Sequence, residues 1–154
     1  MGKVCSWEEL ETNLAPLRGK KKIVFTNGCF DLLHVGHVRY LQEAKSLGDI
    51  LVVALNTDES VKLLKGPTRP VQNESDRAEI LAALGCVDFT TLFSEQTPAN
   101  IIQVVKPDIL VKGGDWKIEQ IVGADFVQSY GGKVYSLNFV DGKSTTNLIQ
   151  KAKS

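Results

Sequence analysis

Short, almost unbroken apolar runs alternate with helix-patterned segments along most of this chain, and this alternation restricts the possible folds more than any other feature. The runs comprise residues 21–26, 49–56, 87–93, 107–115 and 133–139. The segments between them repeat apolar residues every three or four positions, which is the spacing of a helix face. Continuous apolar strands joined by helices are typical of a parallel sheet covered on both faces. We therefore predict an α/β fold with a doubly wound, five-stranded parallel sheet sandwiched by helices.

The two ends of the chain also carry helix signals. Ser6 and Glu9 have the spacing of a capping box, and residues 144–154 begin with hydroxyl side chains suited to N-capping. With 154 residues, no internal repeat and no linker, the chain fits a single domain over residues 1–154. In such a Rossmann-like sheet, ligands bind beyond the carboxyl ends of the strands, at the point where the strand order reverses.

That reversal is expected between the first and the fourth run. The residues at the ends of these runs are TNGCFDLLHVGH, residues 26–37, and VKGGDW, residues 111–116. They are the least ordinary stretches of the chain, and right-handed crossovers bring them to the same edge of the sheet. The functional site is therefore predicted at that edge.

Composition excludes several classes of protein. Lys and Arg total 18, as do Asp and Glu, and zero net charge argues against a general nucleic-acid binder or a protein held on an anionic membrane. The three cysteines, Cys5, Cys29 and Cys86, form no CxxC pair and favour reduced thiols. No secretory leader and no apolar run of about 18 residues is present. We expect a cytoplasmic protein without nucleic-acid or membrane partners.

The chain has two histidines, His34 and His37, and both lie in the first of the two unusual stretches. Their i, i+3 spacing places them on one side of a helix start, and Gly36 between them lets a ligand approach the backbone closely. From the residues alone three roles stay open. They are helix capping or a surface position, a metal pair completed by Asp31, and phosphate binding at the positive end of a helix.

HVGH matches the HxGH signature of the cytidylyltransferase-like nucleotidyltransferases. The resemblance continues in the same order through LNTDESVKLLKGPTRPV, SDRAEIL, DILVKGGDW and DGKSTTNLI, and so covers nearly the whole chain from Lys21 onward. Within this family the chain most resembles the adenylyltransferases that make ADP-heptose from ATP and heptose 1-phosphate. The resemblance implies a role in lipopolysaccharide core synthesis, a separate sugar kinase as functional partner, and a homodimer as the habit of the family.

The resemblance also implies the reaction. An oxygen of the sugar 1-phosphate attacks the α-phosphorus of ATP, and pyrophosphate leaves. His34 and His37 hold the phosphates and stabilise charge on the α-phosphoryl and leaving oxygens, while Lys65 reaches the triphosphate or the sugar phosphate as a third catalytic residue. Mg²⁺ enters with ATP and is held by phosphates and water, so no metal ligands are expected from the protein.

The resemblance implies a set of nucleotide-binding residues at the strand ends and helix starts. They are Thr26, Asn27, Gly28, Cys29, Phe30, Asp31, Gly36, Arg77, Gly113, Gly114, Asp115, Trp116, Ser144, Thr145 and Thr146. The first five form a backbone cradle whose loop Asp31 fixes, with Cys29 as a small residue and not a nucleophile. Asp115 accepts from an exocyclic amine of the base. Trp116 stacks on the base or seals the pocket, although packing in the core is the favoured role for a single Trp. The three hydroxyl residues bind the β- and γ-phosphates, and N-capping explains only one of them.

Three further cations are candidate phosphate ligands. Lys62 and Arg69 are expected to bind the substrate, with a solvated helix face as the alternative for Lys62. Arg77 lies near a helix start, where the helix dipole disfavours a cation. It therefore indicates a bound anion or carboxylate, or an i, i+3 pair with Glu74.

Two other functions remain open at this level. One is a cytidylyltransferase that acts on a polyol or amino-alcohol phosphate, because cytosine and adenine both present an exocyclic amine. The other is a non-catalytic nucleotide-binding module. A flavodoxin-like electron carrier would fit the fold class, but the sequence contains no flavin-phosphate loop.

Overall fold

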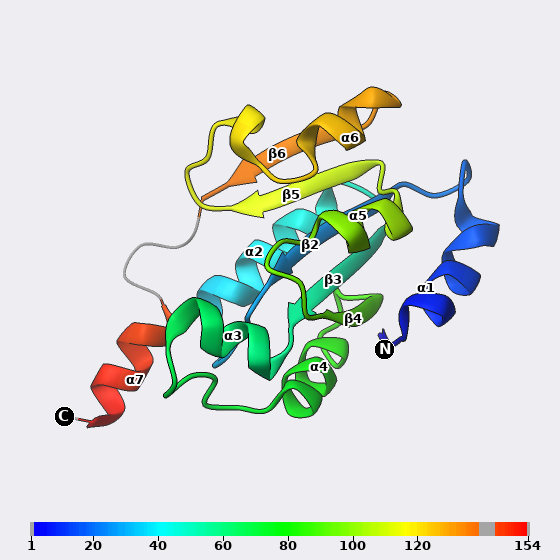
Figure 1. The fold of residues 1–154 in the computed structure, drawn as a ribbon. Helices are drawn as coiled ribbons and strands as arrows, with labels where there is room; N and C mark the ends of the chain where they lie inside the picture. The colour runs from blue at the N-terminus through cyan, green and yellow to red at the C-terminus, as the bar shows by residue number, and fades with distance from the viewer. Residues whose placement is uncertain (1, 139–143, 154) are drawn as a thin grey trace.

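The five apolar runs form the five long strands of the sheet. The computed structural model describes residues 2–138 and 144–153 and contains β2 (Ile23–Gly28), β3 (Ile50–Asn56), β4 (Phe89–Phe93), β5 (Ile109–Gly113) and β6 (Lys133–Leu137). The strand order is β1-β4-β3-β2-β5-β6, and every pairing is parallel. Helices cover both faces (Figure 1). The predicted doubly wound α/β fold is confirmed.

The predicted number of strands is wrong by one. Before the first apolar run, β1 (Lys3–Val4) pairs with the edge of β4, with Lys3 opposite Phe89 and Val4 opposite Thr90. Both residues of β1 are exposed and only one is apolar. A two-residue edge strand of this kind carries no alternating or continuous apolar pattern, so the periodicity could not indicate it.

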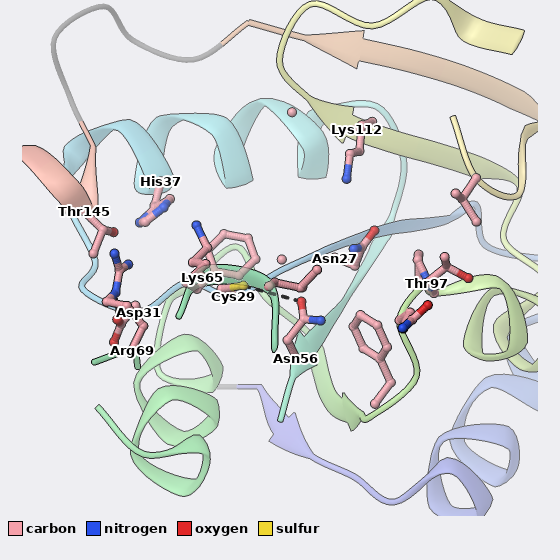
Figure 2. A pocket seen from close by; sticks show the side chains of 18 of the residues that line it. Asn27, Cys29, Asp31, His37, Asn56, Lys65, Arg69, Thr97, Lys112 and Thr145 are labelled. Carbon is pink, nitrogen blue, oxygen red and sulfur yellow. Dashed lines mark hydrogen bonds and ion pairs between the residues drawn. The ribbon is translucent and has the colours of Figure 1, made fainter. Parts of the chain in front are cut away.

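The order of strands reverses at β2, as predicted. The chain builds outward from β2 to β3 and β4 on one side, and then crosses to β5 and β6 on the other. Asn27 near the end of β2 and Lys112 near the end of β5 therefore lie at the same edge of the sheet (Figure 2).

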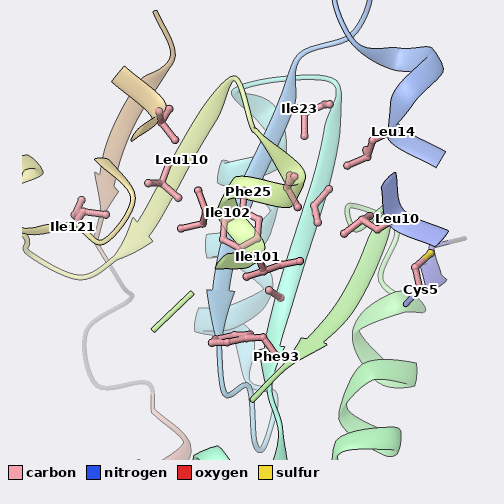
Figure 3. Close-up of a cluster of buried hydrophobic side chains, with 14 of the residues drawn as sticks. Cys5, Leu10, Leu14, Ile23, Phe25, Phe93, Ile101, Ile102, Leu110 and Ile121 are labelled. Atoms are coloured by element: carbon pink, nitrogen blue, oxygen red, sulfur yellow. The ribbon is translucent and has the colours of Figure 1, made fainter. Parts of the chain in front are cut away.

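Two apolar clusters hold the helices against the two faces of the sheet. On one face Phe25 of β2 packs with α1 (Trp7–Leu14), α5 (Ala99–Val105) and α6 (Ala124–Ser129) (Figure 3). On the other, Val24 packs with α2 (Val35–Ser46) and α4 (Glu74–Ala82). Adjacent residues of β2 thus serve opposite faces, which explains why the strand is apolar without interruption.

The remaining helices are short. They are η1 (Ala15–Leu17), α3 (Asp58–Lys65), η2 (Ile118–Gln120) and α7 (Thr145–Lys153). The capping box predicted at Ser6 and Glu9 is present at the start of α1. Gly123, with φ of 89°, separates η2 from α6. Within the described part of the chain, none of the helices combines the length and the apolar character needed to cross a bilayer.

Candidate active site

A cavity of about 430 Å³ lies at the carboxyl ends of β2, β3, β4 and β5. A second hollow of about 180 Å³ adjoins it, because His37, Lys65, Arg69 and Thr145 line both. Of the residues predicted from the sequence, the larger cavity brings together Asn27, Gly28, Cys29, Phe30, Asp31, His37, Lys65, Arg69, Gly113 and Thr145 (Figure 2). His34, Ser144 and Thr146 line the smaller hollow.

The two histidines stand at the N-terminus of α2. His34 is the N-cap residue, and its Nδ1 accepts a hydrogen bond of 3.1 Å from the backbone N–H of Gly36. The imidazole ring of His37 stacks on that of His34 with 3.9 Å between centroids, and its other neighbour is the edge of Phe30 at 5.1 Å. One histidine therefore does cap the helix, but both rings also face the smaller hollow at the positive end of a twelve-residue helix.

His37 is held in its neutral form. Burial, followed by the proximity of His34 and Lys65, lowers the pKa of His37 from 6.5 to about 4. Its Nδ1 is buried and has no hydrogen-bond partner among the described residues. A buried polar atom without a partner is uncommon in a folded protein and indicates that a ligand or water completes the site.

Asp31 ties the turn after β2 to the loop that follows α3. Its carboxylate, only 2% exposed, accepts hydrogen bonds from the backbone N–H groups of Val71 and Gln72 and from Nε of Arg69 at 2.8 Å. Burial opposes ionisation, but these donors outweigh it and lower the pKa of Asp31 below its ordinary value. The contact positions Arg69 in the cavity wall. It also engages the Asp31 carboxylate, which a metal site with His34 and His37 would need as its third ligand.

Arg77 lies beneath the cavity and does not line it. Its guanidinium is 1% exposed and donates to the carbonyl oxygens of Gln72, Cys29 and Asn56. The carboxylate that it binds is Asp58, at 2.8 Å, which agrees with the expected carboxylate partner, whereas the alternative pairing with Glu74 is wrong. That alternative is wrong because Arg77 points into the core toward the strand ends and not along its own helix.

The KGGDW segment is only partly in the cavity. Gly113 lines it, whereas Asp115 is exposed. Trp116 is 45% exposed and its Nε1 donates to the carbonyl of Gly113 at 3.1 Å, so the expectation that it packs in the core is wrong. Its ring lines a small adjoining cavity of about 80 Å³. Gly114 has φ of 112°, which a side chain would strain.

The three hydroxyl residues at the start of α7 have different partners. Ser144 Oγ accepts from the backbone N–H of Asn147 at 3.0 Å and so caps the helix. Thr145 Oγ1 donates to the carbonyl oxygen of Leu32 at 2.9 Å, which attaches α7 to the turn before α2. Thr146 is exposed beside the smaller hollow. Residues 142 and 143, which precede this group in the GKST string, lie outside the described residues.

Three predicted residues remain. Thr26 and Lys62 lie away from the cavity, and Gly36 contributes through its backbone. Thr26 is fully buried, and its hydroxyl is hydrogen-bonded to the Tyr40 hydroxyl at 2.5 Å. Lys62 is exposed on α3 and lines neither hollow, whereas Lys65 at the end of the same helix lines both. Gly36 is buried and uses its N–H to fix His34.

Cys29 lines the cavity, with its Sγ 3.7 Å from Oδ1 of Asn56. Burial raises the pKa of the Cys29 thiol despite nearby cations. The raised pKa disfavours the thiolate that a nucleophile needs.

The sequence reasoning missed several cavity residues. They are Tyr40, Asn56, Leu64, Phe93, Gln96, Thr97, Pro98, Lys112 and Val122. A signal existed for Lys112, because it is a charged residue inside an otherwise apolar strand, and for Asn56, the polar last residue of β3. Gln96 and Thr97 lie in an irregular segment after β4, where composition alone offers no signal.

Comparison with known proteins identifies the family of the chain. The profile of the cytidylyltransferase-like family matches residues 25–146. A relative named bifunctional protein HldE from Geobacter metallireducens is 62% identical over 131 residues, which is 85% of this chain and 27% of the relative. The protein of the same name from Trichlorobacter lovleyi is 55% identical over 150 residues, or 97% of this chain and 30% of the relative.

Among solved structures, a lipopolysaccharide core biosynthesis protein from Thermoplasma volcanium has a TM-score of 0.63 and 31% identity, covering 80% of this chain and 99% of that one. A pantoate-beta-alanine ligase from Francisella tularensis has a TM-score of 0.61 but 18% identity, over 99% of this chain and 77% of that one, and shows a shared fold only. The chain spans less than a third of the length of its bifunctional relatives. Since a second function is part of the same polypeptide in those proteins, they do not support the expectation of a separate kinase.

Proposed function

The chain belongs to the cytidylyltransferase-like family of nucleotidyltransferases, and we propose on that premise that it transfers AMP from ATP to heptose 1-phosphate. The products are ADP-heptose and pyrophosphate, for use in lipopolysaccharide core synthesis. Support for the pathway comes from the core biosynthesis protein of Thermoplasma volcanium, which shares 31% of the aligned residues. Support for the substrate comes from the resemblance of the LKGPTRPV and LVKGGDW segments to heptose 1-phosphate adenylyltransferases, and from the 62% identity with a relative named bifunctional protein HldE.

One observation carries the proposal above the others. The stacked pair His34 and His37, together with Lys65, Arg69 and Thr145, surrounds a single hollow at the N-terminus of α2. Cations, a hydroxyl and a helix N-terminus are the groups that bind polyphosphate, and they converge here from three separate parts of the chain. Neither a metal centre nor a redox site needs that combination.

The chemistry follows from placing the β- and γ-phosphates in this hollow. The α-phosphorus then lies at the entrance to the larger cavity, next to His37, one of the four residues that line both spaces. An acceptor oxygen forms a bond to the α-phosphorus while the bond to the bridging oxygen of pyrophosphate breaks, and pyrophosphate leaves with that electron pair. His37 and Lys65 stabilise the charge that collects on the α-phosphoryl and leaving oxygens, so positioning and electrostatics supply the rate.

Mg²⁺ is expected to accompany ATP, where it neutralises part of the phosphate charge. The described residues contain no group of three His, Cys, Asp or Glu side chains arranged to hold a metal. Among them Asp31 is the one acidic residue that lines the larger cavity, and it already accepts three N–H groups. This donor set fits an ion held by phosphate oxygens and water, which is the common arrangement for Mg²⁺.

A release assay for pyrophosphate tests the proposal. Each reaction contains purified protein, Mg²⁺, one nucleotide and one acceptor. The nucleotides are ATP, CTP, GTP and UTP, and the acceptors are heptose 1-phosphate, glucose 1-phosphate, glycerol 3-phosphate and phosphoethanolamine. The proposal expects the highest kcat/KM with ATP and heptose 1-phosphate. Preference for CTP with a polyol or amino-alcohol phosphate would overturn the sugar assignment, and binding of nucleotide without any turnover would indicate a non-catalytic module.

A further inference from the structure

Lys112 is a cation of the cavity wall that the proposed reaction has not yet used. It lies near the end of β5, and Figure 2 shows its amine directed into the cavity. Its ammonium group lies 5.4 Å from the centroid of the Trp116 ring, and it also interacts electrostatically with Cys29. Within residues 2–138 and 144–153, no carboxylate forms an ion pair with it, although Lys45, Arg69 and Arg77 each have one.

The surroundings of Lys112 favour an anionic ligand. Burial lowers the pKa of Lys112, because removing an ammonium group from water without a counter-charge is unfavourable. The cation–π contact with Trp116 offsets this only in part, since such contacts contribute about 0.5–2 kcal/mol. An anion bound in the cavity would supply the counter-charge for the Lys112 ammonium group.

The cavity separates its cations into two groups. Lys65 and Arg69 line both the larger cavity and the smaller hollow, next to His34 and Thr145. Lys112 lines the larger cavity but not the smaller hollow, and Figure 2 shows it with Asn27 and Thr97 away from Arg69 and Thr145. Among the described lining residues it is the one lysine or arginine on that side.

The geometry of in-line displacement indicates a different role for Lys112 than for Lys65 and Arg69. The attacking and the leaving oxygen must lie on opposite sides of the α-phosphorus. With pyrophosphate leaving into the smaller hollow, the attacking phosphate has to enter from the side of Lys112. Asn27, Gln96 and Thr97, which line the same cavity as Lys112, are neutral donors and acceptors of the kind that sugar hydroxyls bind.

We propose that Lys112 binds the phosphate group of the acceptor and so fixes the attacking oxygen opposite the leaving pyrophosphate. The inference rests on the proposed function, because it requires a phosphorylated acceptor in the cavity. It assigns Lys112 to the acceptor and leaves ATP to the histidines and Lys65. It also assigns Arg69 to ATP, in place of the substrate that the sequence analysis expected Arg69 to bind.

The test compares Lys112→Met with Lys112→Arg and with a matched control, Lys117→Met. Lys117 is an exposed lysine five positions along the chain that lines none of the cavities described above. For Lys112→Met we expect the KM for heptose 1-phosphate to rise about tenfold or more, which corresponds to the loss of one charge-assisted hydrogen bond. The KM for ATP, and the affinity for a non-hydrolysable ATP analogue measured by calorimetry, should change less than about threefold. Lys112→Arg should recover part of the loss.

A thermal unfolding scan separates binding from a structural role. Because Lys112 has no ion-pair partner, its replacement by Met should leave Tm unchanged or raise it. A fall in Tm, an equal loss of affinity for the ATP analogue, or an unchanged KM for the acceptor would each overturn the inference. If the wild-type protein uses a different phosphorylated acceptor, the proposed function is wrong, and the KM for that acceptor then decides the role of Lys112. A wild-type protein inert toward every acceptor would contradict both.

Discussion

The imidazole rings of His34 and His37 stack 3.9 Å apart at the N-terminus of α2, with only 25° between their planes. Two rings in this arrangement do not easily carry two positive charges, because each raises the cost of protonating the other. In the proposed complex, the negative charge of a polyphosphate next to His37 and the N-terminus of α2 would favour the protonated form of His37. Without it, burial and the proximity of His34 and Lys65 keep the pKa of His37 low.

Removal of either ring should therefore slow the reaction without unfolding the protein. His34→Ala and His37→Ala are each expected to reduce kcat by about 10²–10³, the usual effect of deleting one donor to a charged transition state. Steady-state kinetics with saturating ATP measures it. Arg39→Ala, an exposed change on the same helix, should behave as wild type. Normal turnover by His34→Ala would exclude the role given to the histidine pair.

The low pKa of His37 predicts a specific dependence of stability on pH. The pKa is about 4 in the folded protein and 6.5 as its ordinary value. Between these limits the unfolded chain binds a proton that the folded chain does not, so stability is highest above pH 6.5 and falls as the pH is lowered toward 4. We expect Tm to drop more between pH 7 and pH 5 for the wild type than for His37→Asn. Equal drops would show that His37 does not titrate in this range.

The buried contact between Asp31 and Arg69 should matter for both stability and ATP binding. Asp31→Asn removes the charge that holds Arg69 and weakens the hydrogen bonds to the backbone of Val71 and Gln72. The free energy of unfolding should fall by about 2 kcal/mol or more, and the KM for ATP should rise because the loop no longer presents Arg69. Denaturant titration provides the first value. Asp125→Asn, on the exposed side of α6, should change it by less than about 0.5 kcal/mol.

Arg77 is expected to act on the fold and only indirectly on the nucleotide. Arg77→Met leaves the carbonyl oxygens of Cys29 and Asn56 without their donor and Asp58 without its partner. A loss of about 3–5 kcal/mol in unfolding free energy follows. Arg77→Lys should rescue little, since an ammonium group cannot reproduce the planar fork that reaches four acceptors. A fully stable variant with weakened ATP binding would instead place Arg77 in the nucleotide site.

The sequence predicts the fold of this chain well because its strands are buried on both faces. Residues 50–55, for example, are all apolar because this strand is covered on both faces, and coverage of both faces is typical of a parallel sheet. This topology places β2 next to β5 at the point where the strand order reverses, and the cavity lies at that point. β1 escaped prediction because an exposed edge strand of two residues has no such pattern.

Side-chain direction is the part that periodicity cannot supply. Arg77 and Lys62 both lie on helices next to the site, yet Arg77 turns inward beneath the cavity and Lys62 turns to solvent. The direction of Arg77 depends on carbonyl groups of distant strands, which only the assembled sheet brings within reach. Trp116 is exposed for a similar reason, because its indole N–H is satisfied by the local turn at Gly113 and not by the core.

Transfer of the α-phosphorus is the most direct measurement of the reaction itself. Protein is incubated with Mg²⁺, heptose 1-phosphate and ATP labelled with ³²P at the α-position, and the products are separated by chromatography. The label is predicted to move into a sugar nucleotide that co-elutes with ADP-heptose, with unlabelled pyrophosphate released in equal amount. Label that remains in ATP, or that appears as free AMP while the sugar 1-phosphate is unchanged, would contradict adenylyl transfer to the sugar phosphate.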